Sequence, residues 1–137
     1  MKPIIVKSDA PQPIANYSEA FRVGDFVFAA GKTASDFKTG IAPEARINPA
    51  YPYYGSAIKL QTRYILESLS KTFKAAGTSL DNVIKAQVFL TDLSNFNGFD
   101  EVWKKYFKMP PPRTTVGTPG LLSKDTLVEI DLIAVVD

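Results

Sequence analysis

PPPRTTV at residues 110–116 and LVEIDLIA at residues 127–134 are the two stretches that say most about the fold. Three prolines predict a stiff, extended approach to a β-branched run that is typical of a strand. The second stretch predicts another strand, with Glu129 and Asp131 on one face and apolar side chains on the other. Arg113, held on a rigid strand, is suited to bind a carboxylate or phosphate through its planar fork. Carboxylates can carry protons, so the two stretches indicate a small-molecule site without a cluster of metal ligands.

Two helices are expected before these strands. Aromatic residues recur at helical spacing between residues 96 and 107, and the three prolines end that helix. An earlier apolar pattern predicts a helix that begins near residues 54–56 and runs to about Ala76, with Gly77 directly after its end.

The remaining apolar runs predict four more strands. Residues 3–6 suit an edge strand, residues 19–23 and 26–31 suit a hairpin that turns at Gly24-Asp25, and residues 83–90 are rich in β-formers. The expected order is β-β-β-α-β-α-β-β, which predicts an α+β domain spanning residues 1–137, with one sheet and two helices on one face. Residues 32–52 predict a long loop of the kind that is often functional.

The composition excludes several kinds of chemistry. The chain has no cysteine, hence no disulfide, thiolate nucleophile or cysteine-ligated metal. It has no histidine, so Glu, Asp, Lys, Tyr, backbone or water must carry protons. The net charge of +2 is too small to argue for a nucleic acid partner. No apolar run reaches the roughly 18 residues of a membrane span, and the start lacks a long apolar signal region, so we expect a cytoplasmic protein without a membrane partner.

Seven short motifs, each weak alone, follow one another over nearly the whole chain. They are IANYSEA at 14–20, VGDFVFAAG at 23–31, QTRYILESL at 61–69, AAGTSLDNV at 75–83, VFLTD at 88–92, PRTTV at 112–116 and VEI at 128–130. In this order they resemble the YjgF/Rid family of reactive-intermediate deaminases. The resemblance implies a chorismate-mutase-like α+β subunit that assembles as a homotrimer, with its sites in the three clefts between subunits.

The resemblance also implies a reaction and its residues. Family members hydrolyse enamines or imines to ketones and ammonia without a cofactor. Carried over by motif, Arg113 would clamp the substrate carboxylate and Glu129 would position or activate the attacking water. Tyr17 would line the cleft, and the Tyr17 of the neighbouring subunit is one candidate for this position. Gly31 and Thr115 would offer backbone groups to the ligand.

Three departures from the family pattern bear on the substrate. Family members often have glutamine where this chain has Lys32, and asparagine where it has Asp100. The segment between Gly40 and Gln61 looks roughly ten residues longer than in compact members, and it holds three tyrosines. These changes suggest a larger substrate, such as an unsaturated amino-dicarboxylate of the aminomuconate type, with Lys32 meeting a second anionic group. The alternative is a loop that packs on the neighbouring subunit.

Each candidate residue also has a purely structural interpretation. By spacing alone, Arg113 could be a surface arginine, Glu129 a solvated strand residue, Tyr17 a packed loop residue and Lys32 an exposed loop lysine. Two other functions also stay open: a regulator that binds a keto or amino acid without turnover, and an RNA-cleaving or translation-inhibiting protein. The lack of histidine and the small net charge weigh against the RNA-cleaving function.

Overall fold

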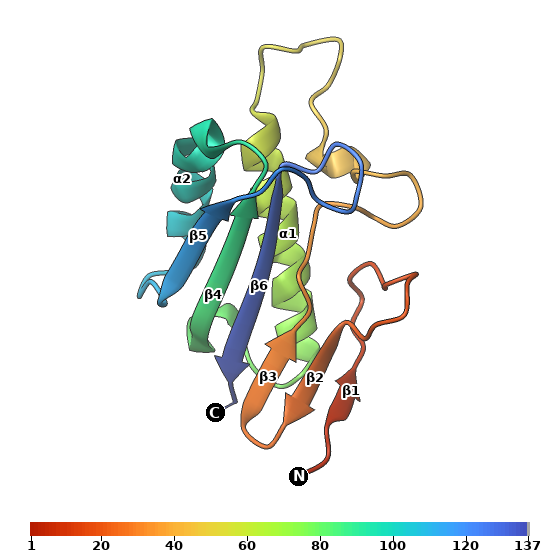
Figure 1. Ribbon diagram of the computed structural model, residues 1–137, viewed down its shortest axis with the longest axis vertical. Coiled ribbons are helices and arrows are strands. Elements are labelled where there is room, and N and C mark those ends of the chain that lie inside the picture. Colours follow the sequence, from red (N-terminus) through yellow and green to blue (C-terminus); the bar gives the residue numbers. More distant parts are fainter. Residues whose placement is uncertain (137) are drawn as a thin grey trace.

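The computed structural model describes residues 1–136, and these form one sheet with two helices behind it (Figure 1). Three short 3₁₀ helices add single turns. The order of strands and long helices is the one expected from the sequence, as is the placement of both helices on one face. The elements are β1 (Ile4–Val6), β2 (Ala20–Val23), β3 (Phe26–Ala29), α1 (Ala57–Ala75), β4 (Val83–Leu90), α2 (Phe96–Tyr106), β5 (Arg113–Gly117) and β6 (Val128–Val135).

The sheet has the strand order β1-β2-β3-β6-β4-β5. Only β4 and β5 pair in parallel, and every other neighbouring pair is antiparallel. The last strand, β6, therefore lies in the middle of the sheet, between β3 and β4. Its residues alternate between full burial and partial exposure, as expected for a strand with helices on one side only.

The core lies between the sheet and the helices. α1 contributes Leu66, Leu69 and Phe73, and β6 contributes Ile130 and Leu132, all of them fully buried. α1 ends in a Schellman motif, because Gly77 has a φ of 87° and its N–H bonds to the Lys74 carbonyl, while the next N–H bonds back to Phe73. Gly77 therefore occupies the position after the helix end that the sequence predicted.

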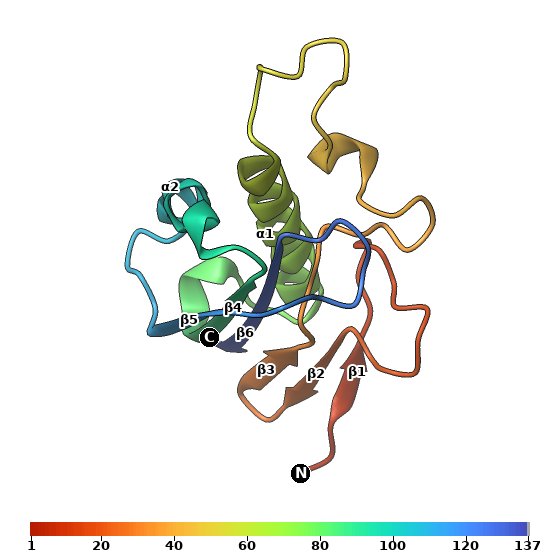
Figure 2. The same cartoon turned by 45° about the horizontal axis from the view of Figure 1, so that its top comes forward.

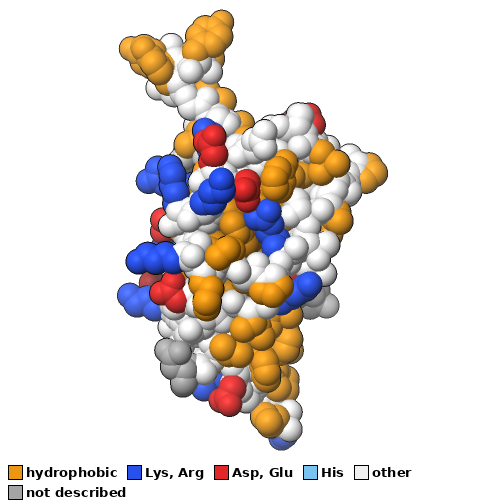
Figure 3. Space-filling view, turned by 90° about the vertical axis from the view of Figure 1, so that its left-hand side faces the viewer, with side chains coloured by type: hydrophobic (Ala, Val, Ile, Leu, Met, Phe, Trp, Pro, Cys, Tyr) orange, Lys and Arg blue, Asp and Glu red, His pale blue; other side chains and the backbone are white. Residues whose placement is uncertain are grey.

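The opposite face of the sheet is open and carries large apolar side chains. Phe21, Phe26, Phe28 and Val116 alternate with helix-facing residues and are each 38–45% exposed. Figure 3 views the β5 edge of the molecule, with hydrophobic side chains along the open face at the lower right and Lys and Arg side chains at the left. A face with this much exposed aromatic surface is typical of a site where another molecule docks.

The segment between β3 and α1 is long but partly ordered by its own contacts. Ser35 pairs with Ile41, and a 3₁₀ turn follows at Pro43–Ala45. The chain then projects away from the body before α1 begins (Figures 1 and 2). No helix within residues 1–136 is long and apolar enough to cross a membrane.

Candidate functional site

The sheet register places the two principal candidates on opposite faces. Arg113 in β5 pairs with Ala86 of β4, which is fully buried against the helices. Glu129 in β6 pairs with Phe89, the side chain of which points to the other side of β4. Paired residues share a face, so Arg113 lies on the helix side and Glu129 on the open side. Within one subunit the two side chains do not converge on one small ligand.

Glu129 lies in a cluster with two other candidates, Tyr17 and Gly31. A Cβ atom at Gly31 would lie 2.7 Å from Glu129 Oε2, so the glycine leaves room for the carboxylate. Burial, and then the charge of Glu129, raise the pKa of the Tyr17 hydroxyl above its ordinary value. The structure thus brings the Tyr17 loop, the end of β3 and the middle strand together on the open face.

The electrostatics of this cluster suit proton transfer. Burial raises the pKa of Glu129 above the ordinary 4.5, and the nearby charge of Asp131 raises it further. Burial also raises the pKa of Asp131. A carboxylate with a raised pKa is a better proton acceptor when ionised and holds a proton closer to neutral pH.

Arg113 lies in a second cluster, between β5 and α2. Its Nε donates to the Thr115 hydroxyl at 3.0 Å, and its Nη1 donates to Asp100 Oδ1 at 2.9 Å. Three aromatic rings of α2 surround the guanidinium, with centroids 5.1–5.5 Å from its central carbon; they belong to Phe96, Phe99 and Trp103. Cation–π contacts and two hydrogen bonds hold the fork in one orientation, as anion recognition requires.

A pocket of about 360 Å³ opens beside Arg113. The proline run and α2 form its walls, with Trp103 and Phe107 as the aromatic lining. Asp100 and Lys104 add one charge of each sign. The pocket is large enough for a small organic acid and has few polar groups, as small-molecule sites commonly do.

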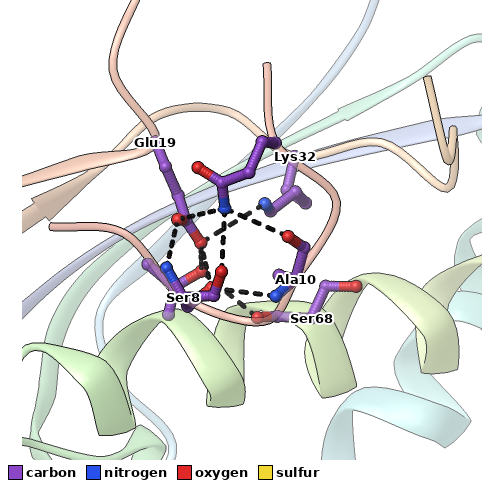
Figure 4. A network of polar contacts seen from close by, with 7 residues as sticks. Ser8, Ala10, Glu19, Lys32 and Ser68 are labelled. Carbon is purple, nitrogen blue, oxygen red and sulfur yellow. Dashed lines mark hydrogen bonds and ion pairs between the residues drawn. The ribbon is translucent and has the colours of Figure 1, made fainter.

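Lys32, which the sequence suggested as a substrate ligand, lies in neither cluster within the subunit. Its backbone bonds to Ile130 in both directions, so its side chain shares the helix-facing side with that residue. The side chain is 8% exposed, and its Nζ lies 3.9 Å from Glu19 Oε2 (Figure 4). Within the subunit the ammonium therefore faces an internal carboxylate.

Glu19 is the centre of a buried polar network. Its Oε1 accepts from the Ser8 N–H and from Gln12 Nε2, each at 2.9 Å, and its Oε2 accepts from the hydroxyls of Ser8 and Thr72. Figure 4 shows Ser8, in the segment after β1, close to Glu19 above α1, with Lys32 nearby. Burial alone would raise the pKa of Glu19, but the hydrogen bonds from Ser8, Thr72 and Gln12 together lower it. Burial lowers the pKa of Lys32, against a smaller opposite effect of the Glu19 charge.

The tyrosines of the long loop lie far out in solvent. Tyr53 is 96% exposed and Tyr54 is 77% exposed, while the rings of Tyr51 and Tyr54 are 5.7 Å apart. Hydrophobic side chains at the projecting tip are visible at the top of Figure 3. With Lys32 buried elsewhere, the two features that suggested a larger substrate do not meet in one place within the subunit.

Sequence reasoning missed two parts of this arrangement. Asp100 was noted only as a departure, although it lies within the helical stripe of Phe96, Phe99 and Trp103, and a carboxylate on such a stripe needs a cationic partner. No periodic pattern in the sequence indicates the role of Glu19, because its partners come from three separate segments. Within residues 1–136 no group of three or more Asp or Glu side chains could hold a metal ion.

Comparisons with known proteins agree with this architecture. The model of the Endoribonuclease L-PSP family matches residues 7–136. A RutC family protein of Pyrococcus horikoshii is 38% identical, and the match covers 98% of each chain. A protein of Dermatophagoides farinae named 2-iminobutanoate/2-iminopropanoate deaminase is 30% identical over 99% of this chain and 98% of its own.

A solved structure extends the similarity to three dimensions. E. coli TdcF, crystallised with bound serine, superposes with a TM-score of 0.79 at 29% identity and covers 98% of this chain and 99% of its own. The motifs, the sheet order and these matches agree over nearly the whole sequence. The chain belongs to the YjgF/Rid family, the family that is also described as Endoribonuclease L-PSP.

Proposed function

We propose that this protein is a cofactor-independent deaminase, which hydrolyses a small carboxylate-bearing enamine or imine to the keto acid and ammonia. The observation that carries the proposal is the pair of clusters: a half-buried Glu129 with a raised pKa, and an oriented Arg113 beside a pocket. Two relatives support the ligand class, since one is named an iminobutanoate deaminase and another was crystallised with serine.

We propose further that the active unit is a homotrimer with its sites between subunits. Arg113 and Glu129 lie on opposite faces of one subunit, so a ligand can touch both only if they come from different copies. The exposed phenylalanines of the open face supply an apolar surface for a second copy to cover. Each cleft then combines Arg113 and Thr115 of one subunit with Tyr17, Gly31 and Glu129 of the next.

The chemistry requires only groups that this chain has. An enamine first tautomerises to the imine, and Arg113 holds its carboxylate through the fork. Water attacks the imine carbon while Glu129 accepts a proton from it, and Glu129 then returns that proton to nitrogen. The hydroxyl proton then passes through Glu129 to the nitrogen, and the carbon–nitrogen bond breaks as the hydroxyl becomes the carbonyl, which releases ammonia and the keto acid. The substrate is already reactive, so positioning and one acid–base group suffice. The acid–base group alone accelerates the reaction by ~10²–10⁴-fold.

Ammonia release from a freshly generated imino acid tests the proposal. Arg113→Ala should lower turnover by roughly 10- to 150-fold, the cost of one charged hydrogen bond, while the circular dichroism spectrum stays that of the parent. Arg113→Lys should also be severely impaired, because lysine lacks the planar fork. Near-parental turnover in the alanine variant would reject the assignment of Arg113.

A binding regulator is the second candidate, favoured by the serine that is bound to TdcF. A regulator would bind an amino or keto acid at Arg113 and release no ammonia. Ribonuclease activity is a weaker candidate, carried only by the family's description. RNA binding that falls steeply with salt would support it.

A further inference from the structure

The arginine proposed to clamp the substrate already has a carboxylate partner in its own chain. Asp100 Oδ1 accepts from Arg113 Nη1 at 2.9 Å, and the side chains of Arg113 and Asp100 are 18% and 26% exposed. The guanidinium and this carboxylate therefore form a partly desolvated pair with no net charge. A ligand that binds Arg113 meets the negative charge of Asp100 as well.

We propose that Asp100 is a specificity-determining residue, which makes the site prefer ligands with both a carboxylate and a protonated nitrogen over plain carboxylates. The inference rests on the proposed function, because it concerns the ligand held by Arg113. The preferred class includes α-amino acids and the iminium form of imino acids. The disfavoured class includes the keto acids that hydrolysis produces.

The free hydrogen-bonding positions of the pair support this selection. Arg113 uses Nε for Thr115 and Nη1 for Asp100, and no residue within 1–136 accepts from its Nη2. Asp100 uses Oδ1 for Arg113, and its Oδ2 has no donor within the same residues. The pair thus has an unused donor on its arginine and an unused acceptor on its aspartate. A carboxylate matches the donor and an adjacent N–H⁺ matches the acceptor.

Electrostatics point in the same direction. A ligand carboxylate bound to Arg113 lies one guanidinium away from Asp100, and like charges at such range repel each other at the effective dielectric near a protein surface. A cationic nitrogen on the ligand offsets that repulsion. The remaining nearby cation, Lys104, is exposed and therefore largely screened.

The reaction removes the positive charge by which Asp100 would distinguish one ligand class from the other. The iminium form carries one positive and one negative charge, and hydrolysis with one water gives ammonium and a keto acid that keeps only the negative charge. The product then has no cation to offset Asp100, so its affinity falls when nitrogen leaves. Asp100 would thereby favour product release after each turnover.

A matched pair of stable ligands tests the inference. L-2-Aminobutanoate and 2-oxobutanoate share one carbon skeleton and differ in the protonated nitrogen. We expect the parent to bind the amino acid more tightly by calorimetry. Asp100→Asn keeps an acceptor for Arg113 but removes the charge, so it should tighten 2-oxobutanoate binding by roughly tenfold and change amino acid binding by less than about threefold.

Glu101→Gln is the control, because Glu101 lies on the same helix and its carboxylate pairs with Lys59 at 2.5 Å, outside the pocket. This variant loses the same charge and should leave the ratio of the two dissociation constants unchanged. If Asp100→Asn also leaves that ratio unchanged while the parent binds both ligands, the inference is wrong and the proposed function stands. If the parent binds neither ligand, or Arg113→Ala binds both as the parent does, the proposed site fails and the inference with it.

Discussion

Two glutamates on opposite faces of the same sheet have opposite environments. Glu19 is 4% exposed on the helix side, accepts hydrogen bonds from three residues and faces the ammonium of Lys32. Glu129 is half-buried on the open side, where burial and then the like charge of Asp131 raise its pKa. Accordingly the pKa of Glu19 is lowered and that of Glu129 is raised.

The difference separates a structural carboxylate from one that is available for chemistry. A carboxylate that is ionised, paired and hydrogen-bonded stabilises its surroundings but has no capacity left for a substrate. A partly buried carboxylate that accepts no hydrogen bonds is destabilised in its ionised form, so it binds a proton more readily. We therefore infer that Glu19, on the helix side, stabilises the fold, and we propose that Glu129, on the open side, is the reactive carboxylate.

The largest effect expected is on turnover, in Glu129→Gln. Glutamine keeps the shape of the side chain but cannot accept a proton, so ammonia release should fall by ~10²–10⁴-fold while 2-oxobutanoate binding changes little. Asp131→Asn is the control on the same strand and face and should cost far less. If binding falls and turnover per bound substrate does not, Glu129 only positions the ligand.

The next largest effect is on stability, in Glu19→Ala. This change leaves the buried Lys32 without its carboxylate and several donors without an acceptor, so the free energy of unfolding in urea should fall by about 3 kcal/mol or more. Glu129→Ala, the same substitution on the other face, should change it by less than about 1 kcal/mol. The double variant Glu19→Gln/Lys32→Gln should recover part of the loss, because it buries no unpaired charge. A Glu19→Ala protein as stable as the parent at equal concentration would contradict the comparison.

A smaller effect, of opposite sign for the two glutamates, is expected in the pH dependence of stability. The folded pKa of Glu19 lies below 4.5, so the unfolded chain binds more protons there and stability is lost as the pH falls through the folded pKa. The folded pKa of Glu129 lies above 4.5, so the folded protein holds its proton longer and stability is lost as the pH rises through that value.

Urea midpoints measured from about pH 3 to about pH 8 should separate the two contributions. Glu19→Gln should flatten the acid side of the profile, and Glu129→Gln should flatten the side above pH 4.5, apart from the share of Asp131, which has the same sign. Parallel profiles in both variants would mean that the two environments do not differ as described.

The smallest effect expected is that of Gly31→Ala. The added Cβ meets the end of a flexible side chain, Glu129 Oε2, and not backbone, so stability should change by less than about 1 kcal/mol. The carboxylate must move, however, and turnover should fall roughly tenfold. Gly120→Ala, where nothing lies within 4 Å of the new Cβ, is the control and should behave as the parent. Equal activities of the two variants would mean that the Glu129 position tolerates displacement.

Local pattern predicted most of the fold because each element has its own signal. The alternation along β6 predicted which residues lie on each face of that strand, and the aromatic spacing predicted α2 to within one residue of its end at Tyr106. Lys32 shows where this reasoning ends. Its burial depends on Glu19, thirteen positions earlier along the chain, and on a bridge to β6, neither of which has a local signature. The partnership of Arg113 with Asp100 likewise joins a strand to a helix, so the sequence could name both residues but not their contact.

Subunit mixing tests the central claim most directly, namely that Arg113 and Glu129 act in one site only across two copies of the chain. Alone, Arg113→Ala should keep at most about a tenth of the parental activity, and Glu129→Gln at most about a hundredth. After the two variants are unfolded and refolded together in equal amounts, about a quarter of the clefts should combine an intact Arg113 with an intact Glu129. Ammonia release should then recover to about a quarter of the parental rate per cleft. Activity that stays at the level of the separate variants, in a mixture shown to contain hybrid oligomers, would contradict the account.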